Sequence, residues 1–183
     1  EYGGFEQFAQ FLSKDLAQDN FDVTIYNPHF HHPDVHDLNG VNIVHKWCPE
    51  SLLGAAAHFI FDFLSLKDAI NKNFDIILEL GYGTSAISIF MLQSKTSIIV
   101  TNMDGMEWKR DKWSPLTKQF MHWSESIAVQ KSDYIISDNN GISDYILKTY
   151  NKNSMMIPYG TEEFKNPDQR ILREYQLLTI YNI

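Results

Sequence analysis

A nine-residue segment, 102–110, concentrates more reactive side chains than any other part of the chain. It reads Asn-Met-Asp-Gly-Met-Glu-Trp-Lys-Arg and follows an apolar run, 97–101, that predicts a buried strand. In an open α/β sheet, ligands bind in the crevice at the carboxyl ends of the strands. A loop that only turned the chain would consist of Gly, Asn, Asp or Pro. The segment therefore predicts a binding site, with a capped helix start and solvated charges as the alternative.

The charged residues of this segment indicate what such a site could bind. Asp104 and Glu107 are three residues apart, so on an opening helical turn they would share one face. There they could orient hydroxyl groups through charge-assisted hydrogen bonds. Lys109 and Arg110 could hold a phosphate or neutralise the two carboxylates. Hydrolases also use paired carboxylates, but sequence spacing alone does not support that class.

Two adjacent glycines, Gly3 and Gly4, precede the first predicted helix. Backbone N–H groups at a helix start suit a phosphate, whereas a plain tight turn is the alternative. The segment lacks a complete Gly-x-Gly-x-x-Gly pattern, and no acidic residue follows at the distance of a ribose anchor. Both omissions weigh against a nicotinamide-dependent oxidoreductase.

Two further turns follow predicted strands and should border the same crevice. Tyr82 and Gly83 follow a strand at 75–80, and Tyr82 could stack on the face of a sugar. A glycine turn with a capping threonine is the alternative. Asp138 follows a strand at 134–137, where capping of the next helix is favoured over contact with a substrate.

Four histidines in one polar loop, His29, His31, His32 and His36, resemble a metal-binding tract. Their spacing is irregular and no cysteine joins them, so a solvated surface loop is favoured and no metal or other cofactor is expected. Cys48 is the only cysteine of the chain, which excludes an internal disulfide and fits a reducing, cytoplasmic compartment.

The composition restricts the class of protein and its partners. The chain has 183 residues, of which 44% are hydrophobic and 14% aromatic, as expected for one ordered domain with a sizeable core. Its net charge of −8 argues against a nucleic-acid partner and weakens electrostatic docking on anionic lipid. The most apolar stretch, 52–64, is too short to span a membrane and carries His58 and Asp62.

Hydrophobic periodicity predicts strands that alternate with helices along the chain. Strands are expected at 22–26, 41–47, 75–80, 97–101, 134–137 and 154–157. Helices are expected at 5–20, 52–70, 85–92, 115–130, 142–150 and 167–175, with Ser114 as a cap before Pro115. This order predicts a doubly wound, mostly parallel, Rossmann-like sheet with helices on both faces.

The beginning of the sequence departs from a complete sheet of this kind. A doubly wound sheet normally starts with a central strand, and the turn after that strand carries the glycines. Here Gly3-Gly4 has no strand before it. Two neighbouring strands should then expose unpaired edges in the middle of the sheet, unless a strand is supplied from elsewhere.

Four motifs resemble the amino-terminal half of a bacterial rhamnosyltransferase-like group within the family 4 glycosyltransferases. The resemblance spans nearly the whole chain, and segment 102–110 is its most specific part. The other motifs are Tyr2-Gly3-Gly4-Phe5-Glu6, the pair Ser132-Asp133-Tyr134-Ile135-Ile136-Ser137-Asp138 and Gly141-Ile142-Ser143-Asp144-Tyr145-Ile146, and Ile157-Pro158-Tyr159-Gly160.

The resemblance implies one half of a two-domain GT-B enzyme that transfers sugar with retention of configuration. The donor would be a nucleotide sugar, such as one of rhamnose or another deoxyhexose, and the acceptor a cell-surface glycan or its lipid-linked precursor. It implies that Asp104 orients the acceptor and assists electrostatically at the catalytic centre. The substrate-binding residues would be Gly3, Gly4, Tyr82, Gly83, Asn102, Glu107, Lys109, Arg110, Asp138 and Tyr159.

The same resemblance implies the domain organisation. Residues 1–162 would form the acceptor-side domain, and residues 163–183 would connect it to a carboxyl-terminal donor domain outside this chain. Relatives often contact the inner face of the membrane through a basic amino-terminal half; the acidic balance here departs from that pattern and leaves membrane association open. A stand-alone carbohydrate- or partner-binding module without catalysis is the alternative function.

Overall fold

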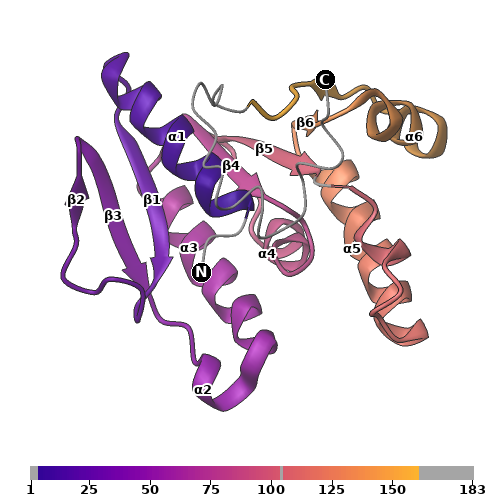
Figure 1. Cartoon of the computed structure of the whole chain (residues 1–183), viewed down its shortest axis with the longest axis horizontal. Helices are drawn as coiled ribbons and strands as arrows, with labels where there is room; N and C mark the ends of the chain where they lie inside the picture. The colour runs from indigo at the N-terminus through magenta and orange to yellow at the C-terminus, as the bar shows by residue number, and fades with distance from the viewer. Residues whose placement is uncertain (1–3, 104, 161–183) are drawn as a thin grey trace, which may run out of the picture.

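The computed structural model describes residues 4–103 and 105–160 and shows parallel strands with helices packed against them (Figure 1). The first part of the chain contains α1 (Gly4–Gln18), β1 (Val23–Pro28), β2 (Asp37–Leu38), β3 (Val41–Lys46), α2 (Glu50–Leu53), the 3-10 turn η1 (Gly54–Ala56) and α3 (Ala57–Asn71). The second part contains β4 (Ile76–Leu80), α4 (Ser85–Met91), β5 (Ile98–Met103), the 3-10 turn η2 (Glu107–Lys109), α5 (Pro115–Lys131), β6 (Tyr134–Ser137), α6 (Asn140–Tyr150) and β7 (Met155–Met156). The helix expected at 167–175 lies outside the described residues.

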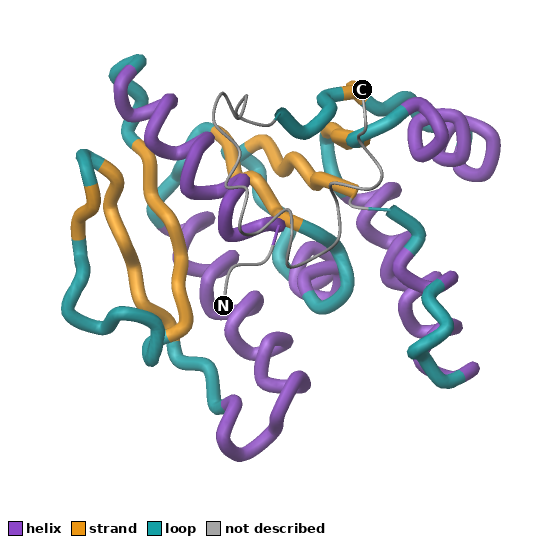
Figure 2. Tube along the Cα trace, viewed as in Figure 1, coloured by secondary structure: helices purple, strands orange, loops and turns teal. Residues whose placement is uncertain are grey.

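The strands form two sheets. The larger one has the order β4-β5-β6-β7, and each neighbouring pair in it is parallel. The smaller one has the order β1-β3-β2, in which β1 and β3 are parallel and β2 runs antiparallel to β3. Helices alternate with these strands along the chain (Figure 2). The predicted Rossmann-like α/β class is therefore confirmed.

Strands β1 and β4 each form one edge of their sheet in the described part of the chain. Among residues 4–103 and 105–160, β1 pairs only with β3 and β4 only with β5, as expected for a sheet without its first strand. Helix α1 bridges the two parts. It packs on β1 and β3, and the ring of Phe5 lies so close to Gly81 that a Cβ there would be 3.3 Å from Cε2. Because Gly81 directly follows β4, this contact brings the start of α1 to the carboxyl end of that strand.

Two apolar clusters form the core. One lies between α3, α4 and the first strands of the larger sheet, and its buried members are Leu66, Ile89 and Ile99. The other joins α4, α5 and α6 to β5 and β6; its buried members are Tyr82, Ala86, Met103, Ile127, Ala128, Val129, Ile135, Ile142 and Ile146. The helices thus bury one apolar face each against the sheet, while the strand ends remain at its carboxyl edge.

Most of the predicted elements occur within a few residues of their expected bounds, with two differences. The polar histidine loop ends in β2, which is only two residues long and lacked a periodic signal. The helix expected at 52–70 is interrupted at Gly54, whose φ of +53° lies outside the right-handed helical region. The expected cap at Ser114 is confirmed, because its side chain accepts a hydrogen bond from the Thr117 backbone N–H. In the described part of the chain, no helix is both long enough and apolar enough to cross a membrane.

Candidate functional site

The loop after β5 lies at an edge where three parallel strands end together. Leu80 of β4 pairs with Asn102 of β5, and Met103 of β5 pairs with Ser137 of β6. Segments that follow these strands therefore emerge side by side. From Gly105 onward the loop forms η2 and packs on α5. Asp104, the predicted catalytic residue, and Gly3 lie outside the described residues.

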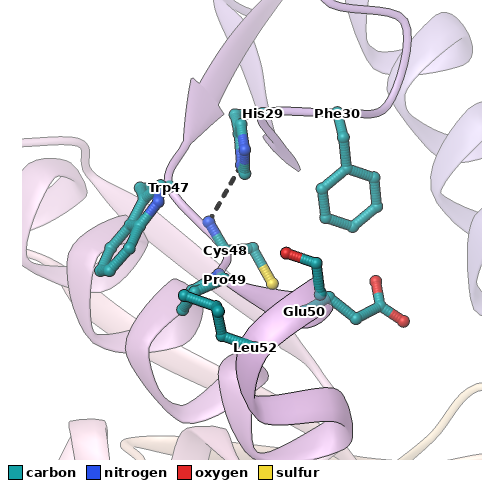
Figure 3. Close-up of a pocket in the computed structure, with 8 residues that line it drawn as sticks. His29, Phe30, Trp47, Cys48, Pro49, Glu50 and Leu52 are labelled. Carbon is teal, nitrogen blue, oxygen red and sulfur yellow. Dashed lines mark hydrogen bonds between the residues drawn. The ribbon is translucent and has the colours of Figure 1, made fainter.

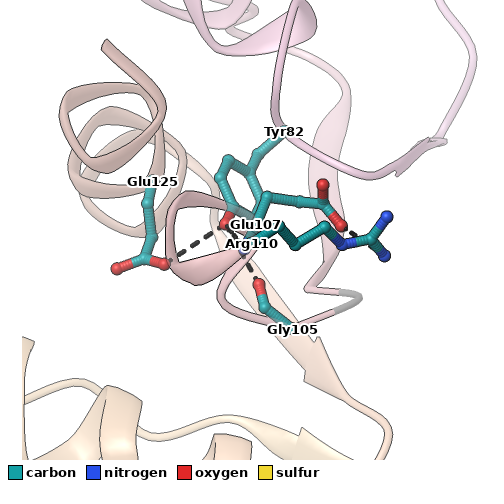
Figure 4. Close-up of polar contacts among 5 residues, drawn as sticks. All are labelled: Tyr82, Gly105, Glu107, Arg110 and Glu125. Atoms are coloured by element: carbon teal, nitrogen blue, oxygen red, sulfur yellow. Dashed lines mark hydrogen bonds and ion pairs between the residues drawn. The ribbon is translucent and has the colours of Figure 1, made fainter. Parts of the chain in front are cut away.

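Tyr82 holds the loop in place through its hydroxyl group (Figure 4). Its hydroxyl accepts a hydrogen bond from the backbone N–H of Glu107 at 3.0 Å. The hydroxyl also lies 3.0 Å from the carbonyl oxygen of Gly105 and 3.3 Å from Oε2 of Glu125, either of which can accept its proton. Only 2% of Tyr82 is exposed, so its ring offers no face to a sugar. The expected stacking role is wrong for this structure; the tyrosine is a support for the loop.

Glu125 of α5 is the centre of this support, and the sequence interpretation missed it. The side chain is fully buried and accepts hydrogen bonds from three neutral donors, while the proton of a fourth, Tyr82, is shared with the Gly105 carbonyl. Trp108 Nε1 lies 3.0 Å from Oε2, and the hydroxyls of Tyr145 and Tyr150 each lie 2.6 Å from Oε1. The helical spacing of the sequence could have revealed this residue. Glu125 follows Met121 by four residues and precedes Ala128 by three, so it lies on the apolar face of the helix.

The buried carboxylate of Glu125 forms no ion pair with any of the described residues. Such a charge is tolerated only when hydrogen bonds replace its water shell. Burial is the main cause that raises the pKa of Tyr82, Tyr145 and Tyr150, and the Glu125 carboxylate raises it further. The three phenols therefore remain protonated and available as donors.

The cations of the loop are engaged at its surface. Arg110 forms an ion pair with Glu107, at 2.8 Å between Nη2 and Oε1, and the arginine side chain remains 52% exposed (Figure 4). The ammonium of Lys109 lies over two aromatic rings, 5.2 Å from the centroid of Trp108 and 5.7 Å from that of Tyr145. Arg110 thus neutralises Glu107, and Lys109 lies on aromatic rings. Both side chains are exposed and remain accessible to a ligand.

Asn102 and Tyr159 meet at the carboxyl end of β5. Asn102 is 2% exposed, and its Nδ2 lies 3.2 Å from the hydroxyl of Tyr159. Its Oδ1 is buried and has no hydrogen-bond partner among the described residues. Turning the amide would only exchange the two atoms, so one polar atom is unsatisfied in either orientation. The ring of Tyr159 also packs edge-on against Phe8 of α1, with centroids 5.4 Å apart.

The remaining predicted residues take mostly structural positions. Gly4 begins α1, close to the end of β4 through the contact of Phe5 with Gly81. Gly83 packs against Met121 of α5, where an added Cβ would lie 3.4 Å from Cε. Asp138 follows β6 at the same edge and accepts a hydrogen bond from Asn139 at 2.7 Å. Asn139 caps α6, with its Oδ1 accepting from the Ile142 backbone N–H. The structure thus places these residues around one strand edge.

A second pair of carboxyl groups comes from β4 and α3. Burial, together with the negative charge of nearby Asp62, raises the pKa of Glu79 to about 8, and burial raises the pKa of Asp62 to about 6. Glu79 is a partly buried residue of β4. Thr84 donates to Asp62 and makes no capping hydrogen bond to α4, contrary to the glycine-turn alternative. The charged forms of both carboxyls are therefore disfavoured.

The histidine loop is linked to β3 rather than to a metal centre. His45 Nε2 lies 3.0 Å from the carbonyl oxygen of His31, and the rings of His36 and His45 are 5.5 Å apart. Within the described part of the chain, no group of three or more His, Cys, Asp or Glu residues could hold a metal ion.

Fold and site together define a Rossmann-like α/β domain whose polar residues gather at the carboxyl edge of a parallel sheet. The chain belongs to DUF1972, a family described as a domain of unknown function, which matches residues 1–162. This family is associated with glycosyltransferase-like proteins. A comparison with curated proteins found no match.

Proposed function

We propose that this chain is the acceptor-side half of a retaining GT-B glycosyltransferase of the rhamnosyltransferase-like group. In the complete enzyme a sugar, rhamnose or another deoxyhexose, passes from a nucleotide donor to a cell-surface glycan or its lipid-linked precursor. Residues 1–162 form the acceptor-side domain, residues 163–183 lead toward the donor domain, and the enzyme works in the cytoplasm.

The observation that carries this proposal is the amide of Asn102 at the end of β5, whose Oδ1 finds no hydrogen-bond partner in the described part of the chain. A buried polar atom without a partner is costly, by about 1–3 kcal/mol, and such atoms recur where a ligand completes the hydrogen bond. The accessible Glu107–Arg110 ion pair lies in the loop that follows. Amide, carboxylate and guanidinium groups are suited to hydroxyl and phosphate oxygens, which are the polar groups of a nucleotide sugar and its acceptor.

In this proposal each residue of the site has a separate role in sugar transfer. Asn102 and Glu107 orient hydroxyl groups of the acceptor, and Asp104 aligns the reacting hydroxyl and stabilises the charge that develops there. The donor phosphate assists in removing the proton of that hydroxyl. Arg110 and Lys109 stabilise the departing diphosphate once the donor domain closes on the cleft. Glu125 and Tyr82 do not touch substrate; they hold the loop in the geometry that this alignment needs.

The test uses the gene that encodes this chain, in its own host. Asp104→Asn should remove one glycosidic linkage from the surface polysaccharide, as measured by linkage analysis and NMR of the purified glycan. Asp111→Asn is the matched control, because Asp111 belongs to the same loop region and its side chain is fully exposed. A polysaccharide unchanged by Asp104→Asn would refute the assigned site, and a polysaccharide unchanged by deletion of the gene would refute the function.

A further inference from the structure

A pocket of about 480 Å³ lies at the carboxyl ends of β1 and β3, apart from the loop that follows β5. Its lining residues are His29, Phe30, Trp47, Cys48, Pro49, Glu50, Ser51 and Leu52. In Figure 3, Phe30 and Glu50 stand on one side and Trp47 on the other, with His29 and Cys48 between them. The volume lies within the range of about 300–1,000 Å³ that is typical of small-molecule sites.

The polar groups of this pocket favour a neutral ligand with hydroxyl groups. His29 Nδ1 accepts a hydrogen bond from the Cys48 backbone N–H at 3.1 Å, so the neutral imidazole carries its proton on Nε2 and can donate it. Glu50 offers an exposed carboxylate as acceptor. No Lys or Arg among residues 4–103 and 105–160 lines the pocket, and a carboxylate repels phosphate. A nucleoside diphosphate or an anionic lipid headgroup is therefore disfavoured here.

The apolar groups supply flat and accessible surface. Phe30 is 41% exposed, Trp47 54% and Leu52 80%. Single exposed apolar residues are ordinary, but three that line one pocket form a patch that indicates binding. An indole gives a large rigid apolar face at small entropic cost, which matches the C–H face of a sugar ring.

We propose that this pocket binds a neutral saccharide unit, with the sugar ring on Trp47 and its hydroxyls on His29 and Glu50. The inference rests on the proposed function, since the saccharide would be a unit of the acceptor glycan remote from the reacting hydroxyl. Such a subsite would use binding away from the reaction centre to position the acceptor.

The experiment observes the indole N–H signals of the four tryptophans in the ¹⁵N-labelled whole chain by NMR, each assigned by a Trp→Phe variant. The probes are methyl glycosides of rhamnose, glucose, galactose, mannose and N-acetylglucosamine, each up to about 50 mM, because single sugars bind weakly, with Kd near 1 mM or above. At least one probe should shift the Trp47 signal in a saturable way. Glu50→Gln should weaken that binding about tenfold, which corresponds to about 1.4 kcal/mol.

Trp123→Phe is the control, because Trp123 is 49% exposed on α5, away from the pocket, and its replacement should leave saccharide binding unchanged. A Trp47 signal that no probe shifts, or binding that survives Glu50→Gln and Trp47→Ala undiminished, would overturn the proposal. Chain dimerisation or binding to phosphatidylcholine vesicles that is lost in Trp47→Ala, without any saccharide shift, would assign the pocket to another occupant. None of these outcomes bears on the linkage lost in Asp104→Asn, so failure here is distinguishable from failure of the proposed function.

Discussion

Replacement of Glu125 by Gln is the sharpest test of how the loop after β5 is held. Glu125 is fully buried and accepts from Trp108, Tyr82, Tyr145 and Tyr150. Glutamine has nearly the same shape but only one acceptor oxygen and no charge. Because the indole N–H of Trp108 cannot reverse its role, the new oxygen must occupy the Oε2 position and the amide nitrogen the Oε1 position.

The two hydroxyls at the Oε1 position, of Tyr145 and Tyr150, then lose a charged acceptor 2.6 Å away. A hydrogen bond to a charged group contributes about 1.5–3 kcal/mol, and rotation of the hydroxyls to accept from the amide recovers part of this. We therefore expect Glu125→Gln to lower the free energy of unfolding by about 3 kcal/mol. Glu125→Ala should lower it by about 4–5 kcal/mol, because it removes the acceptor of Trp108, Tyr145 and Tyr150 and creates a cavity, whereas Tyr82 keeps the Gly105 carbonyl as acceptor.

Urea denaturation followed by circular dichroism measures these differences, and the indole N–H shift of Trp108 reports whether the loop has moved. Gln130→Ala on the same helix is the control; Gln130 is exposed, and its loss should change stability by less than about 0.5 kcal/mol. If Glu125→Gln unfolded at the wild-type urea concentration with an unshifted Trp108 signal, the carboxylate would not be the support that the geometry indicates.

Three further predictions follow from other parts of the fold. The pKa of Glu79 is raised from 4.5 to about 8, so between these pH values the folded state keeps a proton that the unfolded state has lost. The free energy of unfolding should therefore fall as the pH rises through this window. Urea titrations at several pH values should show a smaller fall for Glu79→Gln. Gly81→Ala should lower the free energy of unfolding by about 2 kcal/mol, because φ is +92° there and the new Cβ would contact Phe5. Gly83→Ala should be nearly neutral, because the flexible side chain of Met121 can move aside. Thermal unfolding of the two variants compares them. The 183-residue chain alone should bind nucleoside-diphosphate sugars with Kd weaker than about 1 mM and transfer no sugar, and micromolar binding by calorimetry would contradict this.

The sequence was informative wherever local chemistry determines structure. Ser114 before Pro115 predicted a helix start that the structure confirms, and the apolar runs predicted the strands of the parallel sheet. It was less informative about tertiary roles. Tyr82 follows a strand at the correct edge, but only the packing of α5 shows that its ring is buried and not available to a ligand.

The same reason explains what the sequence interpretation missed. Glu125 is one acidic residue in a helix that also carries exposed polar residues, and its four partners come from three other segments of the chain. The pocket at Trp47 joins the ends of two strands with the start of α2, which no single stretch of sequence reveals. Contacts between residues far apart in the chain depend on the assembled fold, so a periodic pattern cannot predict them.

The central claim is that the edge after β5 serves sugar transfer, and isotope incorporation tests it most directly. The complete protein would be combined with membranes of a host strain that lacks the gene and with radiolabelled nucleoside-diphosphate rhamnose and other deoxyhexose donors. We predict that label enters the glycan or lipid-linked fraction with the wild-type protein and with Asp111→Asn, and that Asp104→Asn lowers the rate by about a hundredfold or more. Incorporation at the wild-type rate by Asp104→Asn, or no incorporation from any of these donors, would contradict the account.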